Sequence, residues 1–378
     1  GELTIRRYTR YAEGGSGLIW FEATSIKKAC CSGPRQLVIS KDTMPEFKRL
    51  VEHIRLSASA AFGNNHRVYL VLQLTHSGRF SRPDGTPKPE VVCGNPFLDG
   101  KREGLKILSD RELEDLREDF IEAGILAEKA GFDAVDIKAC HGYLIHEMLG
   151  SFTRAGSRFG GMPFENRVRF LCDTLRGIKD NTKKISTASR ISFYDGIPYP
   201  YGFGVQREGS VRINLEEPVR LVKQLVESGT CLVNGTMGIP RYNPHVNRPF
   251  DRLLPGGEIP CEHPLEGVVR LIRGVGRIKE AVPDSVLVGT GYSWLRYYFP
   301  NVASAVISEG MATFIGVGRG SFAYPDAPKD LMKYGKIDRK KVCISCSRCT
   351  ELMRHNQTTG CVIRDKEIYE SIYKKISE

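Results

Sequence analysis

The sequence predicts an α/β protein, a (β/α)8 barrel whose first strand is missing from the chain as given, followed by a short cysteine-rich tail. Short apolar strand candidates alternate with amphipathic helical stretches, which implies a parallel sheet. Seven such units occur, so one unit of an eight-unit barrel is unaccounted for. Gly1–Tyr11 looks like a loop-to-helix segment that would follow the missing strand. A doubly wound open sheet is the main rival, but no G-x-G-x-x-G fingerprint follows an early strand.

The predicted strands are short and mostly apolar, and most are rich in β-branched or aromatic residues. This composition is expected of strands that are buried on both faces. If the missing strand counts as the first, they are strands two to eight. They are Gly17–Glu22, Val68–Gln73, Ala134–Ile137, Ile185–Ile191, Cys231–Asn234, Val286–Val288 and Thr313–Gly316.

The clearest predicted helix starts at Ser109, where Glu112 three residues later completes a capping box. An apolar stripe follows, and Gly131 ends the helix. Similar patterns predict four more helices. They are Pro45–Ser57, Phe164–Asp180, Glu216–Ser228 and Leu265–Glu280, the last with Gly267 as an alternative start.

Length and composition limit the classes of protein to consider. The 378 residues, 41% of them hydrophobic, suffice for one large domain or two ordinary ones. No apolar run approaches the roughly 18 residues of a membrane span, and Gly1–Arg10 is too polar for a secretory signal. Eleven cysteines without regular pairing fit a reducing compartment, so we expect a cytoplasmic protein.

The net charge of +11 favours anionic small-molecule partners. No extended basic stripe with interleaved aromatic residues occurs, so we expect no nucleic-acid partner. The sequence leaves homo-oligomer formation open.

Four cysteines near the C-terminus have the spacing of metal ligands, C-x2-C-x2-C-x11-C. Two-residue gaps let several thiolates converge on one point, as iron–sulfur clusters and zinc sites both require. They are Cys343, Cys346, Cys349 and Cys361. We therefore expect a barrel over residues 1–341 and a metal-binding tail over residues 342–378.

Polar residues follow several predicted strands at the end where barrel active sites form. Gln73 ends the third strand, and its amide suits a planar heterocycle. Lys138, His141 and Tyr143 crowd the end of the fourth strand. A cation, an imidazole and a phenol at one point can bind an anionic oxygen and deliver a proton. A structural role for the Gln73 amide as a strand cap remains an alternative.

Arg190 lies in the fifth strand, where a buried guanidinium needs an anionic or carbonyl partner or a structural salt bridge. The roles of Asn234–Thr236 and Tyr242–His245 stay open. Glycines follow the last two strands and would let backbone N–H groups approach a phosphate. These residues are Gly289, Gly291 and Gly318, with Arg319 adding positive charge.

These segments, in this order, resemble the old yellow enzyme family of FMN-dependent oxidoreductases over nearly the whole chain. The cysteine tail narrows the resemblance to the branch that includes 2,4-dienoyl-CoA reductase and trimethylamine dehydrogenase, which carries a 4Fe–4S cluster after the barrel. The motifs that carry it are Tyr11–Ala23, Gln73–Arg79, His141–Leu144, Phe159–Arg167, Gly318–Arg319 and the four cysteines.

The resemblance implies a role for each matching residue. Ala23, Gln73 and Arg190 would contact the flavin ring, and Gly289, Gly291, Gly318 and Arg319 would hold the FMN phosphate. Cys343, Cys346, Cys349 and Cys361 would bind the cluster. Tyr143 would donate the proton, and His141 would help to bind the substrate oxygen.

The implied activity is reduction of a C=C bond conjugated to a carbonyl, carboxylate or thioester. The cluster would relay electrons to FMN from an external donor, NAD(P)H or a redox protein. Lys138 departs from the family, since many relatives have His there. It would either favour a more anionic substrate oxygen, such as a carboxylate or enolate, or tune the reduced flavin. Two further departures are absences: we expect the chain as given to lack the family's first strand and an in-chain dinucleotide-binding region.

Two other functions compete with this one. The first is amine dehydrogenation or demethylation, which needs an aromatic cage for a cation and is disfavoured by the charge of Lys138. The second is a non-enzymatic zinc-containing scaffold that binds nucleic acid. Zinc ligands come more often as two separated pairs, which disfavours this function.

Overall fold

A computed structural model describes residues 1–100, 104–208 and 210–377. Its main sheet is parallel throughout and runs in the order β1-β3-β6-β7-β8-β9-β10, with the short β2 also paired to β3. The strands are β1 (Leu18–Trp20), β2 (Thr24–Ser25), β3 (Tyr69–Thr75), β6 (Ala134–Ile137), β7 (Ser186–Ser192), β8 (Leu232–Thr236), β9 (Leu287–Gly289) and β10 (Phe314–Ile315). Each strand except β2 begins and ends within two residues of a predicted strand. The sequence did not predict β2.

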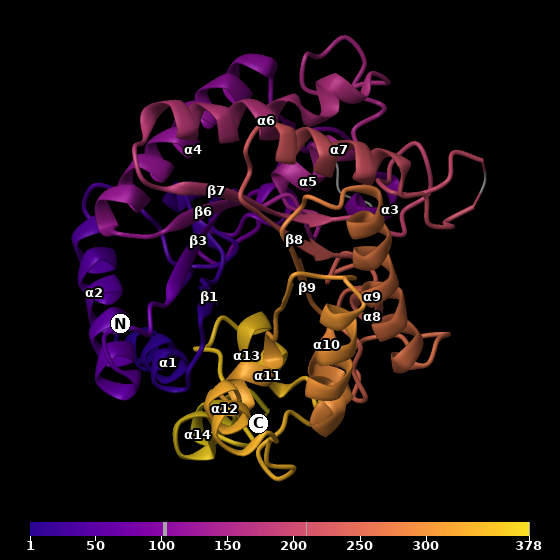
Figure 1. Cartoon of the computed structure of the whole chain (residues 1–378). Coiled ribbons are helices and arrows are strands. Elements are labelled where there is room, and N and C mark those ends of the chain that lie inside the picture. Colours follow the sequence, from indigo (N-terminus) through magenta and orange to yellow (C-terminus); the bar gives the residue numbers. More distant parts are fainter. Residues whose placement is uncertain (101–103, 209, 378) are drawn as a thin grey trace.

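The sheet curls with its helices outside, as in an α/β barrel (Figure 1). Among the described residues, β1 pairs only with β3, and β10 pairs only with β9, so these two edges are not joined. The unjoined edges flank the place that a first strand would take. The predicted barrel class is confirmed, and its sheet is open between these edges.

The outer helices bury one apolar face each against the sheet. They are α2 (Met44–Phe62), α4 (Asp110–Ala130), α6 (Phe164–Asn181), α7 (Glu216–Glu227), α9 (Pro264–Ala281) and α10 (Phe299–Ser308). The capping box of α4 is confirmed, and Gly131 ends that helix in the left-handed conformation at φ 90°. The alternative start of α9 at Gly267 is wrong, because His263 and Glu266 form a capping box three residues earlier.

Smaller elements complete the chain. A separate two-stranded sheet joins β4 to β5 in the segment between β3 and α4. These elements are α1 (Glu2–Glu13), β4 (Glu90–Val91), α3 (Pro96–Asp99), β5 (Lys106–Ile107), α5 (Leu144–Leu149), α8 (Pro244–Asn247), α11 (Arg319–Ala323), α12 (Ala327–Tyr334), α13 (Arg348–Arg354) and α14 (Lys366–Ser377), with 3-10 turns at Lys28–Cys30, Gly78–Phe80 and Tyr292–Tyr298.

The interior of the sheet changes from apolar to polar along the strands. Since side chains alternate between faces, every second residue points inward. Nearer the amino ends of the strands, the interior holds an apolar cluster of Val71, Ala134, Ala188 and Leu232, with Trp20 packed against it. Further along, the register pairs Gln73 with Asp136 and Arg190 with Asn234. The polar side chains therefore gather at the carboxyl ends of the strands.

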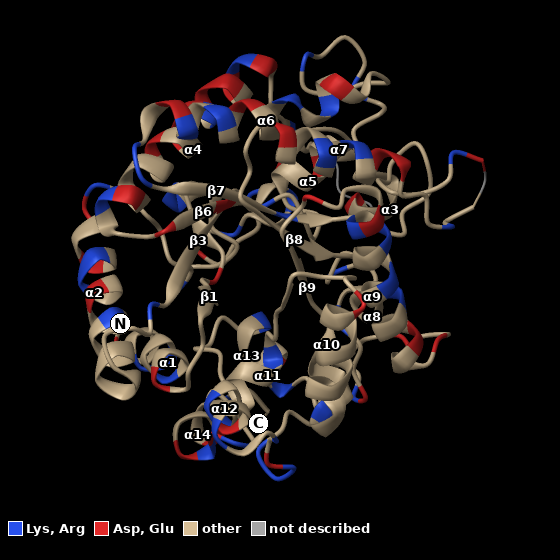
Figure 2. Ribbon diagram, in the orientation of Figure 1, with Lys and Arg blue, Asp and Glu red and all other residues tan. Residues whose placement is uncertain are grey.

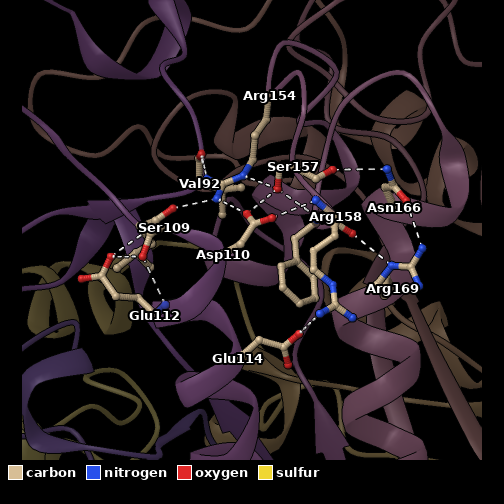
Figure 3. Close-up of polar contacts among 12 residues, drawn as sticks. Val92, Ser109, Asp110, Glu112, Glu114, Arg154, Ser157, Arg158, Asn166 and Arg169 are labelled. Carbon is tan, nitrogen blue, oxygen red and sulfur yellow. Dashed lines mark hydrogen bonds and ion pairs between the residues drawn. The ribbon is translucent and has the colours of Figure 1, made fainter.

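The outer surface mixes both signs of charge over α2, α4, α6 and α7 (Figure 2). A partly buried polar network joins the start of α4 to the loop after α5 (Figure 3). In it, Arg154 donates to the carbonyl of Leu108 at 2.8 Å and pairs with Asp110 at 2.7 Å. Among the described residues, no helix is long and apolar enough to cross a membrane.

Candidate active site

Lys138 and Tyr143 are in contact at the end of β6. The backbone N–H of Lys138 donates to Leu74 on β3, and its side chain is buried. The ammonium nitrogen lies 3.6 Å from the centroid of the Tyr143 ring, and Phe80 meets that ring edge-on. A cation over a phenol ring is attracted electrostatically, more strongly where water is excluded. The two groups are thus held together, as the crowding at this strand end predicted.

His141 and Gly142 form a tight left-handed turn directly after β6. Their φ angles are 67° and 75°, and such values are uncommon for a residue with a side chain. The N–H of His141 donates to the Ser192 hydroxyl, and the N–H of Gly142 donates to Nδ1 of His146 at 2.9 Å. His146 lies in helix α5, and it also fixes this turn. Strained backbone of this kind concentrates at functional sites.

The environment of the His141 side chain disfavours a positive charge on its ring. Burial lowers its pKa well below the usual value, and the nearby charges of Arg190 and Lys138 lower it further. Asn247, the last residue of α8, lies 2.7 Å from Nε2 of His141. Asn247 follows shortly after Tyr242–His245, whose roles the sequence left open, and no sequence pattern pointed to Asn247 itself.

Asp136 is a buried carboxylate that organises the middle of the interior. It accepts hydrogen bonds from the Trp20 indole at 2.7 Å, from the Gln73 amide and from the Arg190 backbone at 2.6 Å. Burial raises its pKa despite these donors. The Gln73 amide is therefore oriented by a carboxylate to which no sequence pattern assigned a role. An acidic residue inside a buried strand was the available signal.

Above this carboxylate, two buried polar atoms have no partner among the described residues: Nε of Arg190 and Oδ1 of Asn234. Unsatisfied buried polar atoms are costly and call for an explanation. A polar planar ring bound at the mouth of the barrel, where the carboxyl ends of the strands meet, would satisfy both atoms. The remaining predicted ring contact, Ala23, follows β1, and its carbonyl accepts from the Gln36 amide at 2.9 Å.

The glycine loops after β9 and β10 lie side by side. The N–H of Gly316 donates to the carbonyl of Gly289, and the N–H of Gly320 donates to the Ser293 hydroxyl. Gly291 has a φ of 106°, and a Cβ there would lie 2.6 Å from Leu271, so only glycine fits. Gly318 begins α11, next to Arg319.

Arg319 connects these loops to the tail. One terminal nitrogen donates to the Pro249 carbonyl at 2.6 Å, and the other is buried without a partner among the described residues. A neighbouring guanidinium, Arg248, lies close enough that burial and the charge of Arg319 lower its pKa to about 9. Two cations at one place fit an anionic group such as a phosphate.

The four tail cysteines line one pocket, together with Arg319 and Phe322. This convergence confirms what their spacing predicted. Among the described residues, three metal-ligand atoms come within 4.8 Å of one another only at Cys30, His76 and Glu90. Sulfurs around a single zinc ion would lie about 3.8 Å apart, from the Zn–S distance. Among the described residues, no three of the sulfurs of Cys343, Cys346, Cys349 and Cys361 all lie within 4.8 Å of one another.

Backbone and ion-pair contacts hold the tail in place. Backbone N–H groups donate to the sulfurs of Cys343 and Cys361 at 3.4 and 3.3 Å. Asp365 pairs with Arg6 at 2.7 Å and with Arg10 at 2.6 Å, both on α1. Since the N–H of Asp365 also donates to the carbonyl of Cys361, this clamp ties the last cysteine to the first helix.

The group Cys30, His76 and Glu90 has a different character. Nδ1 of His76 accepts from the N–H of Gly78 at 3.0 Å, so the proton of the neutral ring lies on Nε2, 3.2 Å from Glu90. A protonated nitrogen cannot ligate a metal. The contact with His76 lowers the pKa of Glu90 to about 2. This cluster is therefore a close contact between an imidazole and a carboxylate beside a buried thiol.

The curled parallel sheet, its polar carboxyl end and its paired glycine loops define the class of α/β-barrel proteins with a site at the carboxyl ends of the strands. The chain belongs to the NADH:flavin oxidoreductase / NADH oxidase family, whose model matches residues 2–202. This confirms the resemblance to the old yellow enzymes. A non-enzymatic scaffold does not agree with membership of an oxidoreductase family.

Individual relatives agree with this assignment. The chain is 28% identical to an NADH oxidase of Thermoanaerobacter brockii over 99% of its own length and 52% of the relative's. It is 27% identical to an NADPH dehydrogenase of a Geobacillus strain, covering 83% of this chain and 86% of that one. The chain spans about half the length of the first of these relatives.

Solved structures agree on the fold. A 2-naphthoyl-CoA reductase complex matches 95% of this chain and 51% of its own, with a TM-score of 0.74 at 19% identity. Histamine dehydrogenase from Rhizobium sp. 4-9 matches 96% of this chain and 48% of its own, with a TM-score of 0.72 at 20% identity.

Proposed function

We propose that this protein is an FMN-dependent ene reductase, which reduces a C=C bond conjugated to a carbonyl, carboxylate or thioester. One observation carries the proposal: the Lys138 ammonium lies 3.6 Å from the centroid of the Tyr143 ring. His141, three residues after Lys138, is held neutral beside them. Two donors for an oxygen and one phenolic acid are then available at a single strand end. These are the groups that such a reduction needs besides its hydride source.

The proposed cofactor site uses the residues that the family resemblance implied. Ala23, Gln73 and Arg190 would face the flavin ring, and Gly289, Gly291, Gly318 and Arg319 would hold the phosphate. Support comes from the unpartnered nitrogens of Arg190 and Arg319, which a bound ring and phosphate would satisfy. When bound, FMN would supply the hydride for the β-carbon of the substrate. An external donor, NAD(P)H or a redox protein, would then reduce the flavin again.

The protein side chains would handle the oxygen and the proton. Lys138 and His141 would hold the conjugated oxygen and stabilise the negative charge that it gains. Tyr143 would deliver a proton to the α-carbon, a step typically worth about 10²–10⁴ in rate. The Lys138 ammonium lies against the phenol, which stabilises the phenolate left after transfer.

We also propose that Cys343, Cys346, Cys349 and Cys361 hold a 4Fe–4S cluster and that residues 342–378 serve as its binding tail behind the barrel of residues 1–341. The gathering of the four cysteines around one pocket and the backbone donors to two of the sulfurs support a multi-iron core. Such a cluster supplies electrons one at a time from an external donor.

A Tyr143→Phe variant tests the proposal. With FMN bound, its turnover of a 2-enoic acid or an enoyl thioester should fall by about 10²–10⁴, while flavin content and its reduction by NAD(P)H stay at the wild-type level. Tyr199→Phe is the matched control and should keep its turnover. Unchanged turnover in Tyr143→Phe contradicts the proton-donor role, and turnover of amines instead of alkenes contradicts the reaction class.

A further inference from the structure

We infer that Asn247 is a positioning residue that holds His141 in the tautomer with its proton on Nδ1, which makes that nitrogen a hydrogen-bond donor toward an anionic oxygen. The identity of that oxygen as the substrate's rests on the proposed function. The tautomer itself rests only on the hydrogen bonds described below.

Three contacts fix the orientation of the Asn247 amide. Its nitrogen lies 3.1 Å from the carbonyl oxygen of Met237, 2.7 Å from Nε2 of His141 and 3.2 Å from the hydroxyl of Thr236. A carbonyl oxygen only accepts hydrogen bonds. The amide atom facing Met237 must therefore be the nitrogen, and its second N–H points toward His141.

The orientation of Asn247 determines where His141 carries its proton. Nε2 faces an N–H donor and so must offer its lone pair. The Thr236 hydroxyl lies 3.4 Å from the same nitrogen and can rotate to donate as well. A neutral imidazole has one proton, so this proton is on Nδ1. Among the described residues, no protein acceptor is paired with Nδ1, which leaves it for a ligand.

The surroundings keep the ring neutral. Burial is the largest cause that lowers the pKa of this ring, and the charged and titratable groups that face it lower the pKa further: Arg190 from β7, Lys138 from the end of β6 and His146 from α5. Protonation of Nε2 would also set two donors against each other. His141 is then a neutral donor that adds no charge beside the cationic Lys138, a combination that suits an oxygen bearing one negative charge, such as a carboxylate or an enolate.

Asn247 can hold this position because the preceding loop is fixed. Asn243 accepts from the N–H of Ile239 and donates to the carbonyl of Asp195, both at 2.7 Å. The loop after β8 is thus bonded to the loop after β7 one turn before Asn247. A substitution at Asn247 should therefore change the imidazole more than it changes the fold.

The test is long-range ¹H–¹⁵N NMR of ¹⁵N-histidine protein loaded with FMN, in which a His141→Gln variant identifies the signals of His141. The wild type should show the Nδ1–H tautomer from pH 6 to pH 8. In Asn247→Asp the carboxylate can only accept a hydrogen bond, so Nε2 of His141 should carry a proton and the Nε2–H or doubly protonated form should appear. Asn247→Ala should show a mixture of tautomers, and Asn181→Asp, an exposed control, should match the wild type.

Binding measurements separate this inference from the proposed function. The affinity for a 2-enoic acid should fall about tenfold or more in Asn247→Asp, with flavin content unchanged. An Nε2–H or cationic His141 in the wild type overturns the inference. An Nδ1–H tautomer in a protein that neither binds nor reduces the acid supports the inference and contradicts the proposed function.

Discussion

The mouth of the barrel and the cysteine tail are built in different ways. At the mouth, Gln73, Asp136 and Arg190 come from strands that pair on both sides, so their positions follow from sheet register. In the tail, Ser345 and Ser347 take left-handed conformations between the cysteines, at φ 55° and 60°. The tail is held by side chains far away in the sequence. The backbone therefore fixes the mouth, whereas ion pairs and any bound metal fix the tail.

The largest expected effect is in the tail. Cys349→Ser should remove almost all iron and acid-labile sulfide, because one ligand of a closed set is lost, while FMN content stays at the wild-type level. Metal analysis and flavin extraction measure both quantities. Cys231→Ser, at an exposed cysteine, is the control and should keep its iron. One zinc ion per chain in the wild type would contradict the iron–sulfur proposal.

The next effect is at the mouth and depends on pH. Burial raises the pKa of Asp195 to about 7, although it accepts from the N–H groups of Ile197 and Phe203. The unfolded chain releases this proton near pH 4, so between pH 4 and pH 7 the folded state binds more protons and the free energy of unfolding falls with pH. The loss should reach a few kcal/mol at about 1.4 kcal/mol per pH unit.

Chemical denaturation at several pH values measures this slope. Below about pH 4 the stabilisation is fully present, and above about pH 7 the curve should flatten. Asp195→Asn cannot ionise, so its slope should be shallower whatever its absolute stability. An equal slope in both proteins would show that Asp195 is not protonated in the folded state.

A third prediction concerns charge at the mouth. Lys138→Met should weaken binding of a 2-enoic acid by about 10–100-fold, because a charge-assisted hydrogen bond is lost. A neutral enone should lose less. Perturbation of the flavin absorbance during titration gives both constants, and Lys129→Met on the exposed face of α4 is the control. If the affinities for the acid and for the enone fall equally, Lys138 does not select anionic substrates.

The smallest effect tests the clamp between α1 and the tail. Asp365→Asn should lower the free energy of unfolding by only about 1 kcal/mol, since Arg6 and Arg10 are partly exposed. Iron loss to a chelator should nevertheless be several-fold faster than in the wild type, because Cys361 loses its anchor. Asp180→Asn is the exposed control. Iron loss at the wild-type rate would show that the cluster ligands hold the tail without this clamp.

Local patterns predicted much of this molecule, and long-range pairs account for the rest. The capping box at Ser109 and the strand Ala134–Ile137 follow from neighbouring residues and are confirmed. The convergence of the cysteines followed from their spacing and is confirmed as well.

The bonds of Asp136 to Trp20 and of His141 to Asn247 span 116 and 106 residues. No local pattern encodes such distances. The short helix α8, which carries Asn247, has too few residues for a periodic signal. The roles assigned to the site residues and to the tail stay predictions.

The most direct test of the account uses the FMN-loaded protein, reduced without oxygen and then mixed with one equivalent of a 2-enoic acid. The account predicts that the absorbance of oxidised flavin returns while the acid becomes its saturated product. If the flavin stays reduced with every enoic acid, enone and enoyl thioester, yet oxygen still restores its colour, the protein holds its cofactor but is not an ene reductase.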